Sequence, residues 1–167
     1  MPMLLLSAER FRGFSLLQSA VALAVMALGM LFLVPRLDDL IDEAYRAHVK
    51  AVGSAIQVSA HTFHKVWLTD RNSQLLIAMK MTESGWPLGR KEDVDASSEV
   101  TGAERCTGLW TSLLDIEVPT LTSGDSLSAD FRVEEVEGRC RYYHQLSGNR
   151  YYIEYDAANG RVSWNIR

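Results

Sequence analysis

The chain has 167 residues, of which 47% are hydrophobic, and this length suits one domain or one domain with an appendage. Its formal net charge is −4. Nucleic acid is therefore disfavoured as a partner, because no basic cluster exists beyond Arg36 and the Arg139/Arg141 pair.

The first element in chain order is an apolar run over residues 14–34. It contains no charge, and Ser15, Gln18 and Ser19 are its only clearly polar residues. At about 1.5 Å per residue, a helix of this length is about 30 Å long, which is enough to cross a bilayer.

The flanks of this run predict its orientation in a membrane. Arg10 and Arg12 precede it, whereas acidic residues crowd positions 38–43 after it. Because basic flanks stay on the cytoplasmic side, we expect the N-terminus inside and residues 35–167 outside. A cleavable secretory signal is disfavoured, since residues 33–36 (LVPR) lack the small residues of a signal-peptidase site.

An outside location bears on Cys106 and Cys140, the only two cysteines of the sequence. An even number of cysteines in an oxidising compartment, such as the bacterial periplasm, favours one disulfide bond. The alternative is a pair of buried free thiols.

An amphipathic pattern follows the apolar run. Apolar residues recur every three or four positions, with polar residues on the opposite face. We expect one helix that continues out of the membrane, bends near residues 31–35 because proline removes a backbone hydrogen bond, and ends near Leu68. The expected packing stripe comprises Leu37, Leu40, Ile41, Ala44, Tyr45, His48, Val49, Val52, Ile56, Phe63, Val66 and Trp67.

The rest of the chain predicts an α+β head. Residues 75–81 form a short apolar segment before a turn at 85–89, the polar residues 90–104 indicate a loop, and a short helix is expected to begin near Cys106. Beyond it, period-two alternation and turn residues at 147–149 and 157–160 predict an antiparallel sheet against the long helix. The alternating sets are Cys140, Tyr142, His144 and Leu146; Tyr151, Ile153 and Tyr155; and Val162, Trp164 and Ile166, with Phe131 and Val133 in a further strand.

The start of the apolar run resembles a known family. Residues 12–18 read RGFSLLQ, which is similar to the leader junction of type IV prepilins: a short basic leader ending in glycine, then phenylalanine, then a pattern close to F-T-L-I-E. The resemblance implies cleavage between Gly13 and Phe14 and N-methylation of Phe14. Pro35 matches the proline that pilins commonly carry at this distance from the cut.

One residue departs from that pattern. The family usually has glutamate where this chain has Gln18, and the glutamate neutralises the new α-amine of a neighbouring subunit in the apolar filament core. Glutamine accepts a hydrogen bond but supplies no charge, so it loses the ion pair. Similar departures occur in minor pilins.

Further stretches are similar to pilins of the mannose-sensitive haemagglutinin (MSHA) type, in particular their minor, MshB-like members. These stretches are SGWPLG, CTGLWTSLLD, CRYYHQ and YDAANGRVSW. The resemblance implies a type IV pilin fold with a leader (1–13), a transmembrane and assembly helix (14–34), an amphipathic half (35–68) and a globular head with an antiparallel sheet (69–167).

The implied role is structural: a minor pilin of a Gram-negative surface filament, used in attachment or in filament biogenesis, with no catalytic residue and no cofactor. The implied partners are other pilin subunits, the prepilin peptidase and the inner-membrane assembly platform. The chain would be held in the inner membrane before it enters a cell-surface pilus. Two alternatives remain: a type II secretion pseudopilin, and a signal-anchored periplasmic binding domain that never polymerises.

Other constellations favour ordinary structural roles. His61 and His64 lie one helical turn apart with His48 further back, too few ligands for zinc, so we expect His61 in solvent and His64 at the packing boundary. Residues 156–160 (DAANG) lack the alternating oxygen ligands of a calcium loop and predict a hairpin turn. We expect a solvated strand face rather than an anion-binding surface from Arg139, Arg141 and Arg150, and packing within the head from Trp86, Trp110 and Trp164.

Overall fold

A computed structural model describes residues 16–95, 102–114, 118–124 and 128–166. The predicted leader and the predicted cleavage and methylation site at Gly13 and Phe14 lie outside these residues. The chain divides between Ile41 and Asp42 into two units, and each is described by itself.

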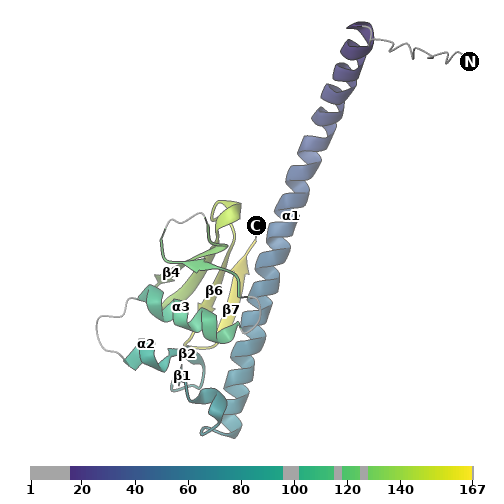
Figure 1. Cartoon of the computed structure of the whole chain (residues 1–167). Coiled ribbons are helices and arrows are strands. Elements are labelled where there is room, and N and C mark those ends of the chain that lie inside the picture. Colours follow the sequence, from purple (N-terminus) through teal and green to yellow (C-terminus); the bar gives the residue numbers. More distant parts are fainter. Residues whose placement is uncertain (1–15, 96–101, 115–117, 125–127, 167) are drawn as a thin grey trace, which may run out of the picture. The chain divides into compact units, whose positions relative to one another are not determined.

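One long helix, α1 (Leu16–Thr69), dominates the first part of the chain (Figure 1). It continues through Pro35 without a break in its assigned helix. Its end lies one residue beyond the predicted Leu68, where Asn72 donates its backbone N–H to the Asp70 side chain at 3.1 Å. Such a turn on an aspartate side chain competes with helical hydrogen bonding and stops the helix.

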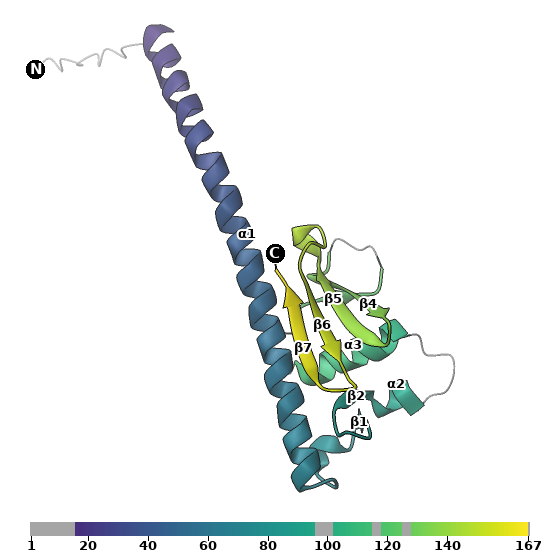
Figure 2. The ribbon, with the colours of Figure 1, turned by 180° about the vertical axis from the view of Figure 1, so that it is seen from behind.

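The second unit, from Asp42 onward, contains a five-stranded sheet with the strand order β3-β4-β5-β6-β7 (Figures 1 and 2). Strands β4 to β7 are antiparallel to one another, as predicted. The strands are β3 (Leu121–Thr122), β4 (Phe131–Val136), β5 (Arg139–His144), β6 (Tyr152–Asp156) and β7 (Arg161–Asn165).

The prediction of a wholly antiparallel sheet is wrong at one edge, because β3 runs parallel to β4. Thr120 and Asp130 hold the two strands together just before they begin. The Thr120 backbone N–H and hydroxyl both donate to Asp130 Oδ2, at 2.9 and 2.8 Å, and the Asp130 N–H donates to the Thr120 hydroxyl at 2.8 Å. These side-chain hydrogen bonds set the register between β3 and β4. Strand β3 has only two residues, which is too short to give an alternating pattern in the sequence.

The segment after α1 contains more regular structure than the sequence suggested. A 3₁₀ turn, η1 (Gln74–Leu76), leads into a hairpin of β1 (Met79–Met81) and β2 (Pro87–Arg90). The predicted loop over 90–104 is wrong at both ends, because α2 (Lys91–Asp95) and α3 (Gly102–Leu113) occupy them. Helix α3 begins before the predicted Cys106, with Glu104 in its first turn and Glu135 against Gly102, where negative charge favours a helix N-terminus.

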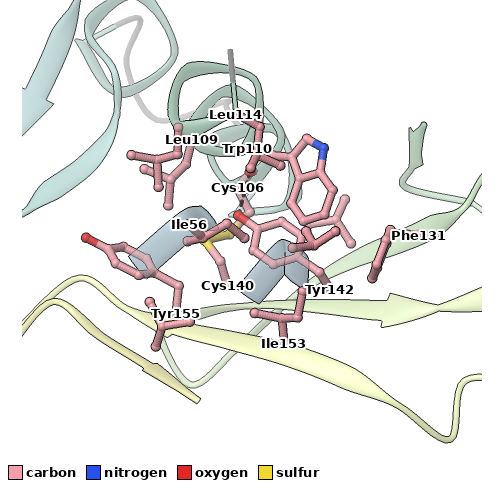
Figure 3. Packing of buried hydrophobic residues seen from close by; sticks show 14 of the residues in the cluster. Ile56, Cys106, Leu109, Trp110, Leu114, Phe131, Cys140, Tyr142, Ile153 and Tyr155 are labelled. Atoms are coloured by element: carbon pink, nitrogen blue, oxygen red, sulfur yellow. Dashed lines mark hydrogen bonds between the residues drawn. A yellow bond between two sulfur atoms is a disulfide. The ribbon is translucent and has the colours of Figure 1, made fainter. Parts of the chain in front are cut away.

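The core lies between the sheet and two helices, α1 and α3, which pack on the same sheet face (Figure 3). The Tyr142 hydroxyl donates to the Cys106 carbonyl at 2.9 Å, and Cys106 forms a disulfide with Cys140 that ties α3 to β5. The predicted disulfide is thereby confirmed, and the free-thiol alternative is excluded by the same bond. The largest fully buried side chains include Trp110, Tyr142, Tyr151, Tyr155, Phe131, Ile56, Leu109 and Ile153.

Burial follows the predicted alternation on β5 and β6 with one exception, whereas on β7 Val162 is buried and the residues from 163 to 166 are all half-buried. Cys140, Tyr142 and His144 are buried on β5, whereas Leu146 is 60% exposed. Leu146 lies in a 3₁₀ turn, η2 (Gln145–Ser147), which follows the strand directly. The change from extended to 3₁₀ backbone ends the period of two, so the side chain turns outward.

Candidate assembly helix and its anchors on the head

The described part of the N-terminal unit contains an apolar helical stretch, residues 20–34, that has no polar face. Between Gln18 and Ile41 every described side chain is exposed except the half-buried Ser19 and Gly29, and Phe32 reaches 78% exposure. A helix that is apolar on all sides is suited to an apolar surrounding, and α1 is long and apolar enough to span a membrane.

The predicted assembly residues fall at separate places on this helix. Gln18 lies near its beginning and is exposed, and Pro35 lies within its helical run. The structure therefore does not bring these two residues together, and the predicted function of each depends on partners outside the chain. The predicted cut at Gly13 and Phe14 would fall just before the first described turn.

From Asp42 onward the same helix changes character and packs on the head. Four side chains on one stripe are fully buried or nearly so, and the half-buried Tyr45 and Phe63 extend the stripe at either end. The prediction that the packing stripe begins at Leu37 is wrong. Leu37, Leu40, Ile41 and Ala44 are exposed, and so is His48 within the predicted stripe. The first residue of this unit with a tertiary partner is polar. The buried stripe comprises Val49, Val52, Ile56 and Ala60.

That first partner is Asp42, which anchors one end of the packed half. Its Oδ1 accepts a hydrogen bond of 2.5 Å from the Tyr151 hydroxyl and lies 3.4 Å from Arg150 Nη2. Its Oδ2 accepts from Arg46 at 3.0 and 2.9 Å. The Tyr151 hydrogen bond, supported by the two arginines, holds the pKa of Asp42 below its ordinary value.

An aromatic stack anchors the other end. His64 Nδ1 donates to the Gly85 carbonyl at 2.8 Å, and its ring lies parallel to Trp86 with 4.0 Å between centroids. Trp67 packs against Gly85 in turn. His61 is exposed and meets Trp86 only edge-on, at 5.2 Å. The predictions for His61 and His64 are confirmed.

Tryptophan rings in this region pack directly against glycines. Trp67 lies against Gly85 and Trp86 against Gly160, and both glycines have positive φ, of 81° and 69°. A Cβ at either position would overlap the indole ring, so glycine is required for both space and backbone conformation. Gly53 on α1 receives Trp164 of β7 in the same way. Sequence reasoning missed these pairs, because the partners are far apart in the chain.

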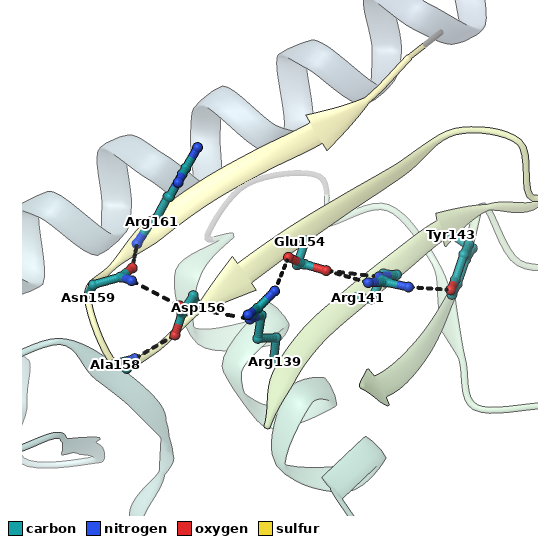
Figure 4. Close-up of polar contacts among 8 residues, drawn as sticks. All are labelled: Arg139, Arg141, Tyr143, Glu154, Asp156, Ala158, Asn159 and Arg161. Atoms are coloured by element: carbon teal, nitrogen blue, oxygen red, sulfur yellow. Dashed lines mark hydrogen bonds and ion pairs between the residues drawn. The ribbon is translucent and has the colours of Figure 1, made fainter. Parts of the chain in front are cut away.

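The opposite face of the sheet carries a network of ion pairs (Figure 4). Arg141 binds Glu154 Oε2 through Nε at 3.0 Å and Nη2 at 2.6 Å, and Arg139 reaches Oε1 at 3.1 Å. Burial raises the pKa of Glu154, but hydrogen bonds from the two arginines outweigh it and hold that pKa below its ordinary value. The predicted solvated strand face is thus charged but internally paired, and Arg150 belongs to the Asp42 anchor instead.

The predicted hairpin turn between β6 and β7 is confirmed. Asp156 Oδ1 accepts from the Ala158 N–H and Oδ2 from the Asn159 side-chain amide, both at 2.9 Å, and Asn159 Oδ1 accepts from the Arg161 N–H at 2.9 Å. These side-chain oxygens are therefore used to close the turn. No three histidine, cysteine or acidic side chains converge as a metal site within the part of the chain that the structure describes.

Comparison of the chain with protein-family models, with curated proteins and with solved structures gives no match.

Proposed function

We propose that the chain is a minor type IV pilin-like subunit of the MSHA type, a structural component of a bacterial surface filament. The observation that supports this most is the change of pattern within α1. Its first half is apolar and exposed on all sides, whereas its second half is fixed to a disulfide-bonded head. The RGFSLLQ stretch lies where a leader peptidase would cut, just before that first half.

The exposed apolar half requires an apolar surrounding. Burying one large apolar side chain is worth about 1.5–3 kcal/mol, so a helix with residues such as Leu23, Leu31 and Phe32 in water is strongly disfavoured. The inner membrane would supply the surrounding before assembly. Apolar helices of other pilin subunits would supply it afterwards, with the head held outside.

The same arrangement would serve a signal-anchored domain that never polymerises, and processing separates the two functions. In cells with an active prepilin peptidase, mass spectrometry of the membrane-extracted protein is expected to show N-methylated Phe14 as the first residue. Gly13→Val is expected to block the cut by crowding the scissile bond.

Gly29→Val is the matched control for that variant, because nothing lies within 4 Å of an added Cβ at Gly29. It makes the same chemical change within the apolar helix and should leave processing intact. Wild-type protein that still begins at Met1 would overturn the pilin proposal and leave the anchored domain.

A further inference from the structure

Two histidines face each other where α1 packs on the sheet. His144, at the end of β5, is only 2% exposed. Its ring centroid lies 5.5 Å from that of His48 on α1. Tyr45 at 5.0 Å and Phe131 at 5.3 Å cover the same ring. The imidazole of His48 on α1 therefore contacts the imidazole of His144 on β5 within one cluster of aromatic rings.

The buried ring is suited to a neutral imidazole. His144 Nδ1 is buried without a hydrogen-bond partner. A neutral ring needs one donor and one acceptor partner, whereas an imidazolium has two N–H groups and a charge to satisfy. Burying that charge without a partner costs far more than burying a neutral ring.

Few groups that carry or can carry charge face His144. From α1 these are His48 and Tyr45, and from the turn before β4, Asp130. Tyr151, just before β6, accepts the His144 N–H with its carbonyl, and its hydroxyl already donates to Asp42. Asp130 is the carboxylate that acts on both histidines. The Thr120 hydroxyl and N–H bind its Oδ2, and they hold the pKa of Asp130 below its ordinary value.

The balance of these groups opposes a charge on His144. Burial, and then the positive charge that His48 can carry, lower the pKa of His144 from its ordinary 6.5, while Asp130 acts in the opposite direction and less strongly. The proton that the unfolded chain takes up near pH 6.5 is therefore taken up by the folded head only at a lower pH.

We propose that the buried His144 ring, with His48 beside it, forms an acid-sensitive latch between α1 and the sheet, which holds while His144 is neutral and loosens on mild acidification. This inference concerns only the packing of the second half of α1 on the head and does not depend on the filament function.

The direction of the pH effect follows from linkage. The folded pKa of His144 is lower than the unfolded one, so the unfolded state binds more protons between the two values. The free energy of unfolding is therefore not reduced by this linkage above about pH 6.5, and it falls as the pH drops toward the pKa of His144 in the folded state. One linked proton raises the unfolding constant by up to about tenfold for each pH unit in this window.

The test uses the full-length protein in detergent micelles. Urea unfolding, followed by tryptophan fluorescence between pH 7.5 and 5, is compared for wild type, His48→Gln and His144→Phe. His61→Gln is the matched control, because His61 is an exposed histidine of the same helix that touches Trp86 rather than another histidine. We expect the added acid sensitivity to vanish in His144→Phe, to shrink in His48→Gln and to persist in His61→Gln.

A second measurement tests the latch without any variant, so it can be made even if His144→Phe does not fold. NMR titration of the folded wild-type protein is expected to show that the His144 imidazole protonates below pH 6.5. Amide exchange, corrected for its intrinsic pH dependence, should accelerate near residues 45–49 more than near 60–66 as that ring charges. A His144 ring that titrates at or above pH 6.5, or equal pH slopes in all four proteins, would overturn the latch.

Discussion

The two halves of α1 share one continuous helix but depend on different surroundings. After Asp42 the helix has one packed stripe, so Ile56 is 1% exposed while Val58, half a turn away, is 67% exposed. Among the described side chains between Gln18 and Ile41 there is no such stripe, and large apolar side chains are exposed on every side. Helix formation by itself therefore contributes little to stability. Packing on the head stabilises the second half of α1, whereas the first half needs an apolar surrounding from outside the chain.

Loss of the disulfide should give the largest difference in stability between the packed head and the apolar half of α1. Cys106 and Cys140 are 34 positions apart, and closing a loop of that size in the unfolded chain is worth about 4 kcal/mol. Cys106→Ser with Cys140→Ser should lower the free energy of unfolding of the head by about that amount, as measured by urea unfolding in micelles. Helical circular dichroism from the apolar half should persist after the head unfolds. A double variant as stable as the oxidised wild type would contradict this prediction.

Truncation of one side chain in each half should give the next largest contrast. Ile56→Ala removes a buried side chain and should cost about 3 kcal/mol of head stability. Leu31→Ala, at a position that is 71% exposed, should change it by less than about 0.5 kcal/mol. Urea unfolding of both variants in the same micelles measures the difference. Similar losses in the two variants would mean that the halves are not independent.

The Asp42 anchor predicts a smaller effect that depends on pH. Tyr151→Phe removes the hydroxyl that donates to Asp42 and accepts from Arg46 Nε at 3.2 Å, and it should raise the unfolding constant by less than about tenfold. Because the hydrogen bond to Asp42 lowers the pKa of that carboxyl, the deficit should be present above the ordinary aspartate value of 3.8 and shrink as the pH falls below it. Unfolding of both proteins at several pH values isolates this bond, and a deficit that does not vary with pH would exclude the anchor.

Gln18 should give the smallest change, and it applies within the proposed filament. Gln18→Glu would add a charge partner for a neighbour's α-amine and should raise the ratio of this chain to the major subunit in sheared filaments by a few fold. Gln57→Glu makes the same change in the packed half and should leave the ratio unaltered. Equal ratios for Gln18→Glu and wild type, at equal protein levels, would remove Gln18 from the control of stoichiometry.

Local patterns predicted most of the head, and contacts between distant residues account for what was missed. Alternation placed Cys140 and Tyr142 on a buried strand face, since side-chain direction in a strand depends only on neighbouring residues. The parallel edge strand depends on Thr120 meeting Asp130 across ten positions, and no local period reveals such a clamp.

The candidate site shows the same division. The apolar helix was predicted from its composition, and the Cys106–Cys140 bond was predicted from an even number of cysteines in an expected oxidising compartment. The Tyr151 anchor on Asp42 and the contact between His48 and His144 did not, because each joins α1 to a strand or loop far along the chain.

The most direct test of the central claim is the composition of sheared surface filaments. Filaments are purified from cells that express the wild-type chain and, in parallel, the Gly13→Val variant, and both are analysed by quantitative mass spectrometry. We predict that wild-type chain beginning at Phe14 is present at a low ratio to the major subunit and that the variant is absent while its membrane level is unchanged. A processed chain that stays entirely in the membrane fraction, in cells that assemble filaments, would contradict a role as a filament subunit.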